Sequence, residues 1–199
     1  MKKIILVLFF FIFTIKVSYA NTYSTEPQMF IAELVNDALG KLSDKNLSKE
    51  DKKAFVEEIA LVNVDINALG LYTLGELRKS TDKKSLEEYQ KSFKKYFLKT
   101  LNSRLSDYSS NKFEVISAEK KSASYTIVRS RITENENQPE IKIDWRIYTK
   151  NPERPLIRDL IVEGLSLARA QKEEFNSILT SNNNDITILI TKLEEFVNR

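Results

Sequence analysis

Residues 156–175, LIRDLIVEGLSLARAQKEEF, change from a strand pattern to a helix pattern within a few positions. Up to Val162 the spacing favours a strand with mostly apolar residues on both faces, and after Ser166 apolar residues recur at helical intervals. Gly164 lies at the change. Asp159 and Glu163 share one side of the expected strand, so they are candidates either for an acid–base pair or for structural pairing.

The rest of the chain places this junction in a larger α+β pattern. Helical spacing predicts helices over about residues 26–43, 48–62, 65–72, 81–108, 167–180 and 186–198. Alternation at every second residue predicts strands over 112–118, 123–133, 140–149 and 155–165, with short polar turns typical of an antiparallel meander. We therefore expect the N-terminal and central helices to cover one face of a curved four-stranded antiparallel sheet, with two further helices at the C-terminus.

The first twenty residues, MKKIILVLFFFIFTIKVSYA, are expected to be a cleaved signal peptide. Two lysines precede an apolar core that is too short to span a bilayer, and Ala20 completes a small-residue cleavage site. We expect cleavage after Ala20 and a single domain over residues 21–199. Loss of this segment removes three of the 31 basic residues and leaves 28 against 28 acidic residues. Such a balance argues against a nucleic-acid-binding domain.

Several kinds of active site are excluded by composition. The chain has no Cys and no His, so disulfides, thiol chemistry, Ser-His triads and His-based zinc sites are all excluded. The four glycines do not form a phosphate-binding loop. Only carboxylate, Lys or Tyr chemistry remains open.

The two acids of the opening stretch do not fit a glycosidase-type pair. Asp159 and Glu163 are separated by about 13 Å along a strand, whereas such pairs need about 5–9.5 Å. A partly buried carboxylate needs a partner, and arginines on the neighbouring strands could supply it. We therefore favour structural pairing, with these candidate partners: Arg129, Arg131, Arg146 and Arg158.

A stripe of large apolar residues follows the longest expected helix. Tyr89, Phe93 and Phe97 share one face of this helix, and Lys84, Lys91, Lys95 and Lys99 lie on the other, which we expect to be solvated. An apolar stripe against an apolar sheet could be a filled core or could leave a pocket for an apolar ligand. The residues alone leave both possibilities open.

The order of three motifs resembles the MlaC/toluene-tolerance family of periplasmic phospholipid-binding proteins, which are auxiliary components of ABC transport. The motifs are LSKEDKKAFVEEIALVNVDINALGLYTLGEL at 47–77, LEEYQKSFKKYFLKTLNSRLSDY at 86–108 and IRDLIVEGLSLARAQKEEFNSIL at 157–179. The resemblance implies that Asp159, Glu163, Gly164 and Ser166 are signatures of the fold rather than catalytic groups. Ser166 would cap the following helix.

The resemblance also implies a function. It predicts a monomeric periplasmic shuttle that moves phospholipid between an outer-membrane lipoprotein complex and an inner-membrane ABC transporter complex, and so maintains the lipid asymmetry of the outer membrane. It implies no reaction, cofactor, metal or nucleic acid. We expect an apolar pocket between sheet and helices, with this lining: Leu74, Tyr89, Phe93, Phe97, Val128, Ile143, Trp145 and Ile161. The alternatives are a carrier of another apolar ligand such as a terpenoid or quinone, an enzyme that uses a buried carboxylate, and an interaction module with a filled core.

Overall fold

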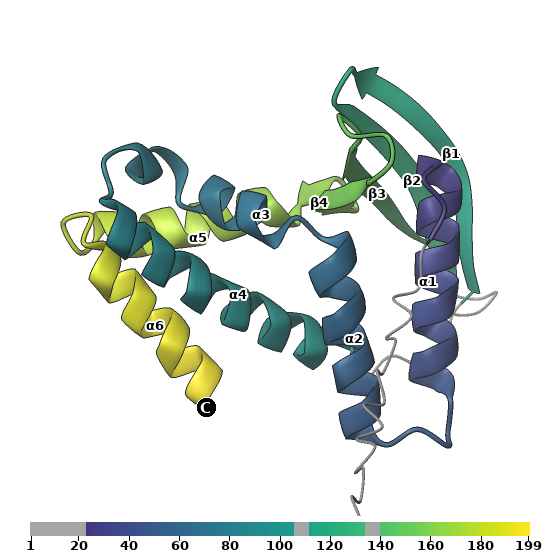
Figure 1. Ribbon diagram of the computed structural model, residues 1–199, viewed down its shortest axis with the longest axis horizontal. Helices are drawn as coiled ribbons and strands as arrows, with labels where there is room; N and C mark the ends of the chain where they lie inside the picture. Colours follow the sequence, from purple (N-terminus) through teal and green to yellow (C-terminus); the bar gives the residue numbers. More distant parts are fainter. Residues whose placement is uncertain (1–22, 106–111, 134–139) are drawn as a thin grey trace, which may run out of the picture.

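The computed structural model describes residues 23–105, 112–133 and 140–199 (Figure 1). The helices are α1 Pro27–Ser43, α2 Lys49–Asn63, α3 Ile66–Thr73, the short 3₁₀ helix η1 Gly75–Lys79, α4 Lys83–Leu105, α5 Leu167–Thr180 and α6 Ile186–Asn198. The strands are β1 Lys112–Ser122, β2 Tyr125–Thr133, β3 Ile141–Tyr148, β4 Leu156–Val162 and β5 Leu165–Ser166. The expected α+β class is confirmed. The expected signal peptide lies outside the described residues.

The strands form one antiparallel sheet in the order β1-β2-β3-β4-β5. The expected number of four strands was wrong, because the last predicted strand is two strands. Glu163 and Gly164 separate them in a two-residue turn, with φ angles of 49° and 81°. Two residues with positive φ are typical of a tight hairpin turn whose twist matches that of the strands.

Helices lie against both faces of the sheet, not against one as expected. Helix α1 covers the face that carries Val128 and Ile147, which we call the α1 face, and Phe30 and Ile31 of the helix are buried in that core. On the opposite face, α3 and the start of α5 lie beside β4. Alternation places successive side chains of one strand on opposite faces. Helices on both sides therefore cover the β4 end of the sheet.

The long helix α4 packs against other helices, away from the sheet (Figure 1). Tyr89 and Phe93 are buried in a second core with Phe175 of α5 and Leu189 of α6. The ring of Phe93 meets that of Phe175 edge-on, with centroids 6.2 Å apart. The aromatic stripe thus fills a helical core.

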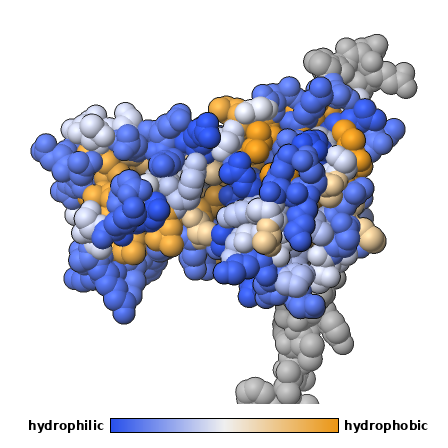
Figure 2. Space-filling model, turned by 90° about the horizontal axis from the view of Figure 1, so that it is seen from above, coloured by the Kyte–Doolittle hydropathy of each residue, from blue (hydrophilic) through white to orange (hydrophobic). Residues whose placement is uncertain are grey.

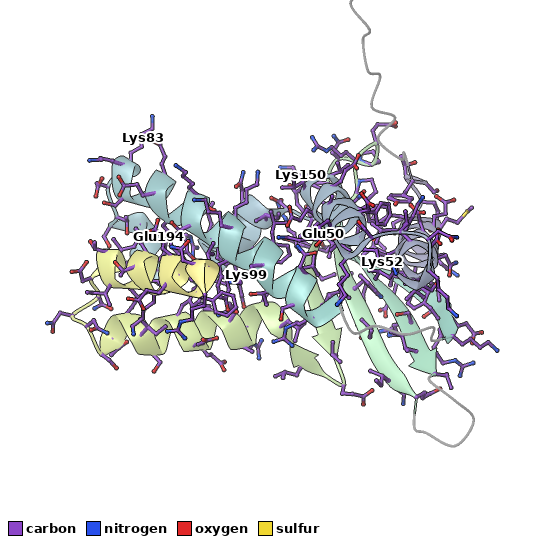
Figure 3. The ribbon with its side chains drawn as sticks, turned by 90° about the horizontal axis from the view of Figure 1, so that it is seen from below. Glu50, Lys52, Lys83, Lys99, Lys150 and Glu194 are labelled. Atoms are coloured by element: carbon purple, nitrogen blue, oxygen red, sulfur yellow. The ribbon has the colours of Figure 1, made fainter. Side chains whose placement is uncertain are left out.

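One of the lysines that were expected to be solvated, Lys99, instead contacts helix α6. Lys99 of α4 and Glu194 of α6 are labelled in Figure 3. Lys99 Nζ donates a hydrogen bond to the Val197 carbonyl at 2.9 Å, and Ser92 Oγ donates to Glu194 at 3.0 Å. Lys84, Lys91 and Lys95 are exposed as expected. The molecule therefore has a helical half, α3–α6, and a sheet half, which meet where α3 and α5 lie against β4 (Figure 1).

Candidate functional site

A cavity of about 770 Å³ lies where the two halves meet. Helix α3, η1 and the start of α5 line one side, and strands β1 to β4 line the other. The lining residues are Ala68, Leu71, Tyr72, Arg78, Lys121, Tyr125, Ile127, Arg129, Asp144, Arg146, Arg158, Ile161 and Ala168. Figure 2 shows hydrophobic side chains reaching an otherwise mostly hydrophilic surface over both halves of the molecule.

Side chains of β2 alternate between the two faces of the sheet, and those that face the cavity are both apolar and basic. Tyr125, Ile127 and Arg129 point to the same side, and Ile127 and Arg129 pair with Arg146 and Asp144 of β3. This side of the sheet, opposite the α1 face, is the cavity face. Apolar residues of the sheet and of α3 form one part of the wall, and five basic residues form another: Arg78, Lys121, Arg129, Arg146 and Arg158.

Arg158 is the most fully engaged of these basic residues. Its Nε donates to Asp65 at 2.8 Å, and its Nη1 donates to the Tyr125 hydroxyl at 2.9 Å. Its guanidinium carbon lies 3.5 Å from the centroid of the Tyr148 ring. Stacking and bidentate pairing suit the planar guanidinium. Arg158 therefore fixes the corner of the cavity where β4 meets α3.

Arg129 and Lys121 share one carboxylate on β1. Glu119 accepts a hydrogen bond from each of them, at 2.8 Å from Arg129 Nη2 and at 2.5 Å from Lys121 Nζ. The bond from Lys121, followed by that from Arg129, lowers the pKa of Glu119 below its ordinary value. These two cations and their acid form a solvent-exposed network at the edge of the cavity.

Arg146 and Arg78 are less tightly held. Arg146 Nη1 lies 3.6 Å from Asp159, which is buried. Arg78 donates to the backbone carbonyl of Gly75. Among the residues that the structure describes, Arg78 has no carboxylate within ion-pair distance, and Arg146 makes no hydrogen bond through its side chain.

Asp159 joins the sheet to helix α5. One of its oxygens accepts from Ser166 Oγ at 2.7 Å and the other from the Ala168 backbone N–H at 3.0 Å. Ser166 Oγ in turn accepts from the Arg169 N–H at 3.0 Å and so caps α5. The carboxylate of Asp159 thus anchors the strand–helix junction.

Glu163 and Gly164 lie outside the cavity, at the turn between β4 and β5. The Glu163 side chain accepts a hydrogen bond from the Lys142 backbone N–H, and the Glu163 N–H donates to the Lys142 carbonyl at 3.0 Å. Glu163 therefore clamps the first residues of β3 to the turn. Gly164 supplies the second left-handed position of that turn.

The structure distributes the eight predicted lining residues over three places. Leu74, Tyr89, Phe93 and Phe97 belong to the helical core. Val128, Ile143 and Trp145 lie on the α1 face, where the Trp145 indole N–H donates to Ser130 Oγ at 2.8 Å. Ile161 alone of the eight lines the cavity described above.

The apolar cavity residues that the prediction missed are Ala68, Leu71, Tyr72, Tyr125, Ile127 and Ala168. The alternation of Ile127 with Arg129 places the two on one face of the strand, but this sequence signal does not say which face meets a cavity. Contacts between α3 and β4, far apart in sequence, decide that.

The described residues contain neither a metal-binding cluster nor a membrane-spanning helix. Within 23–105, 112–133 and 140–199, no cluster of three or more His, Cys, Asp or Glu is placed to hold a metal ion. No helix in those ranges is long and apolar enough to cross a bilayer.

Two comparisons place the chain among known proteins, and a third finds nothing. Residues 32–195 match the family model "MlaC protein". The fold is similar to a solved structure from Ralstonia solanacearum, described as a phospholipid-binding protein in complex with a phospholipid. The TM-score is 0.69 and the sequence identity is 18%, over 84% of this chain and 94% of the other. No curated protein matches the sequence.

Proposed function

The chain belongs to the MlaC protein family, and we propose that it binds a phospholipid in the cavity between α3, α5 and the sheet. The observation that carries the proposal is a cavity of about 770 Å³ with apolar and cationic walls. Pockets for small ligands span about 300–1,000 Å³. The apolar wall suits acyl chains, and the cationic wall suits a phosphate.

The complex of the Ralstonia solanacearum protein with a phospholipid supports the same ligand class. We propose further that the chain is a periplasmic shuttle between an outer-membrane and an inner-membrane complex, which starts with a signal peptide cleaved after Ala20. A carrier is needed because two acyl chains of about 15 methylenes each cost on the order of 24 kcal/mol to expose to water. The shuttle would shield these chains during transfer.

The contact residues are proposed from the geometry of the cavity. Ile161, Ile127 and Leu71 would contact the acyl chains. The other seven residues predicted from the sequence would contact lipid only if the helical core or the α1 face opened to admit it. Their role in binding therefore remains a prediction.

Mass spectrometry of organic extracts tests the proposal directly. We expect the protein, purified from a bacterial periplasm, to carry phospholipid at close to one molecule per chain, and delipidation to lower its melting temperature. A quinone or terpenoid in place of phospholipid would assign the cavity to another apolar ligand. Lipid-free protein whose melting temperature does not respond to added phospholipid would contradict the proposal.

A further inference from the structure

The cavity wall carries more positive than negative charge. Five basic side chains line it, against one acidic side chain, Asp144. Three carboxylates outside the lining pair with these cations: Glu119, Asp65 and Asp159. Even when these three are counted, the basic groups outnumber the acidic groups. A site with a positive surplus beside an apolar wall suits an amphiphile with an anionic polar end.

Three of the five cations are already hydrogen-bonded to carboxylates. Arg158 is held by Asp65 and Tyr125, and its guanidinium stacks on Tyr148. Arg129 and Lys121 share Glu119. A ligand phosphate would have to compete with these carboxylates for Arg158, Arg129 and Lys121.

Arg78 and Arg146 have donors to spare. The hydrogen bond that Arg78 makes goes to the Gly75 carbonyl, which is a neutral acceptor. Arg146 lies 3.6 Å from Asp159, but both oxygens of that carboxylate already accept hydrogen bonds, from Ser166 and from the Ala168 N–H. The Arg146 side chain is 41% exposed. Each guanidinium carries five N–H donors in a planar fork that matches a phosphate.

We infer that Arg78 and Arg146 bind the phosphate of an anionic phospholipid, and that the cavity therefore selects lipids whose headgroup lacks a neutralising ammonium. This inference rests on the proposed function and adds the headgroup class to it. An ammonium beside the phosphate, as in a zwitterionic lipid, would face Lys121 and the arginines and be repelled. The same chemistry would recognise a free phosphate ion, so the test includes one.

The experiment offers delipidated protein vesicles of phosphatidylglycerol and phosphatidylcholine in equal amounts. The protein is then reisolated and its bound lipids are quantified by mass spectrometry. We expect a preference of about fivefold for phosphatidylglycerol, in keeping with partly exposed ion pairs, and a ratio close to one at high salt. Arg78→Gln and Arg146→Gln should each reduce the ratio.

Lys83→Gln is the matched control, because it removes the same charge from the start of α4 and leaves the cavity unchanged. The Lys83 side chain is 91% exposed and points away from the molecule (Figure 3). The ratio of bound phosphatidylglycerol to phosphatidylcholine in Lys83→Gln should equal that of the unmodified protein. Arg146→Gln also removes the cation beside Asp159 and could fail to fold. In that case Arg78→Gln carries the test alone, since Arg78 pairs with no described carboxylate.

Four outcomes would overturn the inference. Equal uptake of both lipids by the unmodified protein excludes headgroup selection but leaves phospholipid binding intact. Uptake of neither lipid excludes the proposed function as well. A ratio that stays at about fivefold in the arginine variants shows that other groups select the headgroup. Inorganic phosphate that raises the melting temperature as much as phosphatidylglycerol does, and blocks lipid uptake, assigns the arginines to a free anion.

Discussion

Asp65 caps helix α3 and at the same time binds Arg158 of strand β4. Asp65 Oδ1 accepts the Ala68 N–H at 3.1 Å, and Oδ2 lies 2.7 Å from Arg158 Nη2. Next to this pair, the Asp65 N–H donates to the Ile157 carbonyl at 2.9 Å. One carboxylate therefore holds α3 over the sheet and so helps to form the cavity between them.

Replacement of Asp65 by Asn tests this connection. Asn is as good a helix cap as Asp, so the change removes mainly the charge-assisted bonds to Arg158. We expect the free energy of unfolding to fall by about 1–3 kcal/mol, measured by urea denaturation. Asp82→Asn, at an exposed position before α4 where Asp82 accepts the Ser85 N–H, is the control and should change stability by less than about 0.5 kcal/mol. Equal losses in both variants would show that the pair with Arg158 contributes nothing.

The Asp159 carboxylate is expected to be structural. Asp159→Asn should lower the free energy of unfolding by about 1–3 kcal/mol, because the buried group loses charge-assisted bonds to Ser166 and the Ala168 N–H. The folded fraction should retain lipid. Glu163→Gln, an exposed carboxylate changed in the same way, should have a smaller effect on unfolding. Loss of lipid from a stable Glu163→Gln protein would assign Glu163 to the ligand site instead.

Two Gly→Ala variants separate the effect of the left-handed backbone at Gly164 on stability from the effect of replacing a glycine within a helix. A Cβ at Gly164 would meet no atom within 4 Å, so the cost of Gly164→Ala comes from its φ of 81°. We expect a loss of about 1–2 kcal/mol. Gly40→Ala is the control, since Gly40 lies within α1 and also has nothing within 4 Å. This change should stabilise the protein by about 0.5–1 kcal/mol in the same denaturation experiment. If both changes stabilised the protein, Gly164 would not need the left-handed backbone conformation that the turn gives it.

Tyr89 is expected to make stability fall at high pH. Burial raises the pKa of its hydroxyl, which donates to the Gly70 carbonyl at 3.2 Å. An unfolded tyrosine loses its proton near pH ~10, whereas folded Tyr89 keeps it. The contribution of Tyr89 is therefore fully present below about pH 10 and is lost as the pH rises toward the folded pKa, by up to about 1.4 kcal/mol per pH unit.

Comparison with Tyr89→Phe isolates this effect. The variant should be less stable near neutral pH, because it lacks the hydroxyl that also contacts Thr73 Oγ1 at 2.9 Å. Its denaturation midpoint should depend less on pH above 10 than that of the unmodified protein. Tyr72→Phe, at an exposed tyrosine, should keep the full dependence. Identical slopes in all three proteins would exclude Tyr89 as the source.

The two faces of the sheet give opposite predictions for lipid occupancy. Ile161→Trp fills the cavity and should reduce bound lipid, measured by mass spectrometry, in a protein that still folds. Val128 is 0% exposed on the α1 face, so Val128→Trp should instead overpack that core and cost about 1–3 kcal/mol. Its folded fraction should keep lipid. Lipid loss in Val128→Trp alone would place the ligand on the α1 face, where Val128, Ile143 and Trp145 of the predicted lining lie.

The sequence by itself determined the secondary structure, because that depends on local periodicity. The strand alternation around Trp145, the helical stripe of Tyr89 and Phe93 and the Ser166 cap all act over a few residues, and the corresponding elements lie close to where they were expected. The apolar residues on both faces of β4 were visible in the same way, although the helices were expected on one face of the sheet. The split of the last strand was missed, because a non-glycine residue with positive φ, Glu163, gives no clear signal in sequence.

Tertiary structure alone decided which apolar residues surround a cavity. An apolar helix stripe packs equally well against a sheet or against other helices, and only the contacts of α4 with α3 and α6 place Phe93 in a helical core. The face of β2 that carries Ile127 became the cavity face because α1 covers the opposite face. Contacts between residues distant in the chain, such as Asp65 and Arg158, hold α3 against the sheet and so form the cavity there. No local pattern in the sequence encodes these contacts.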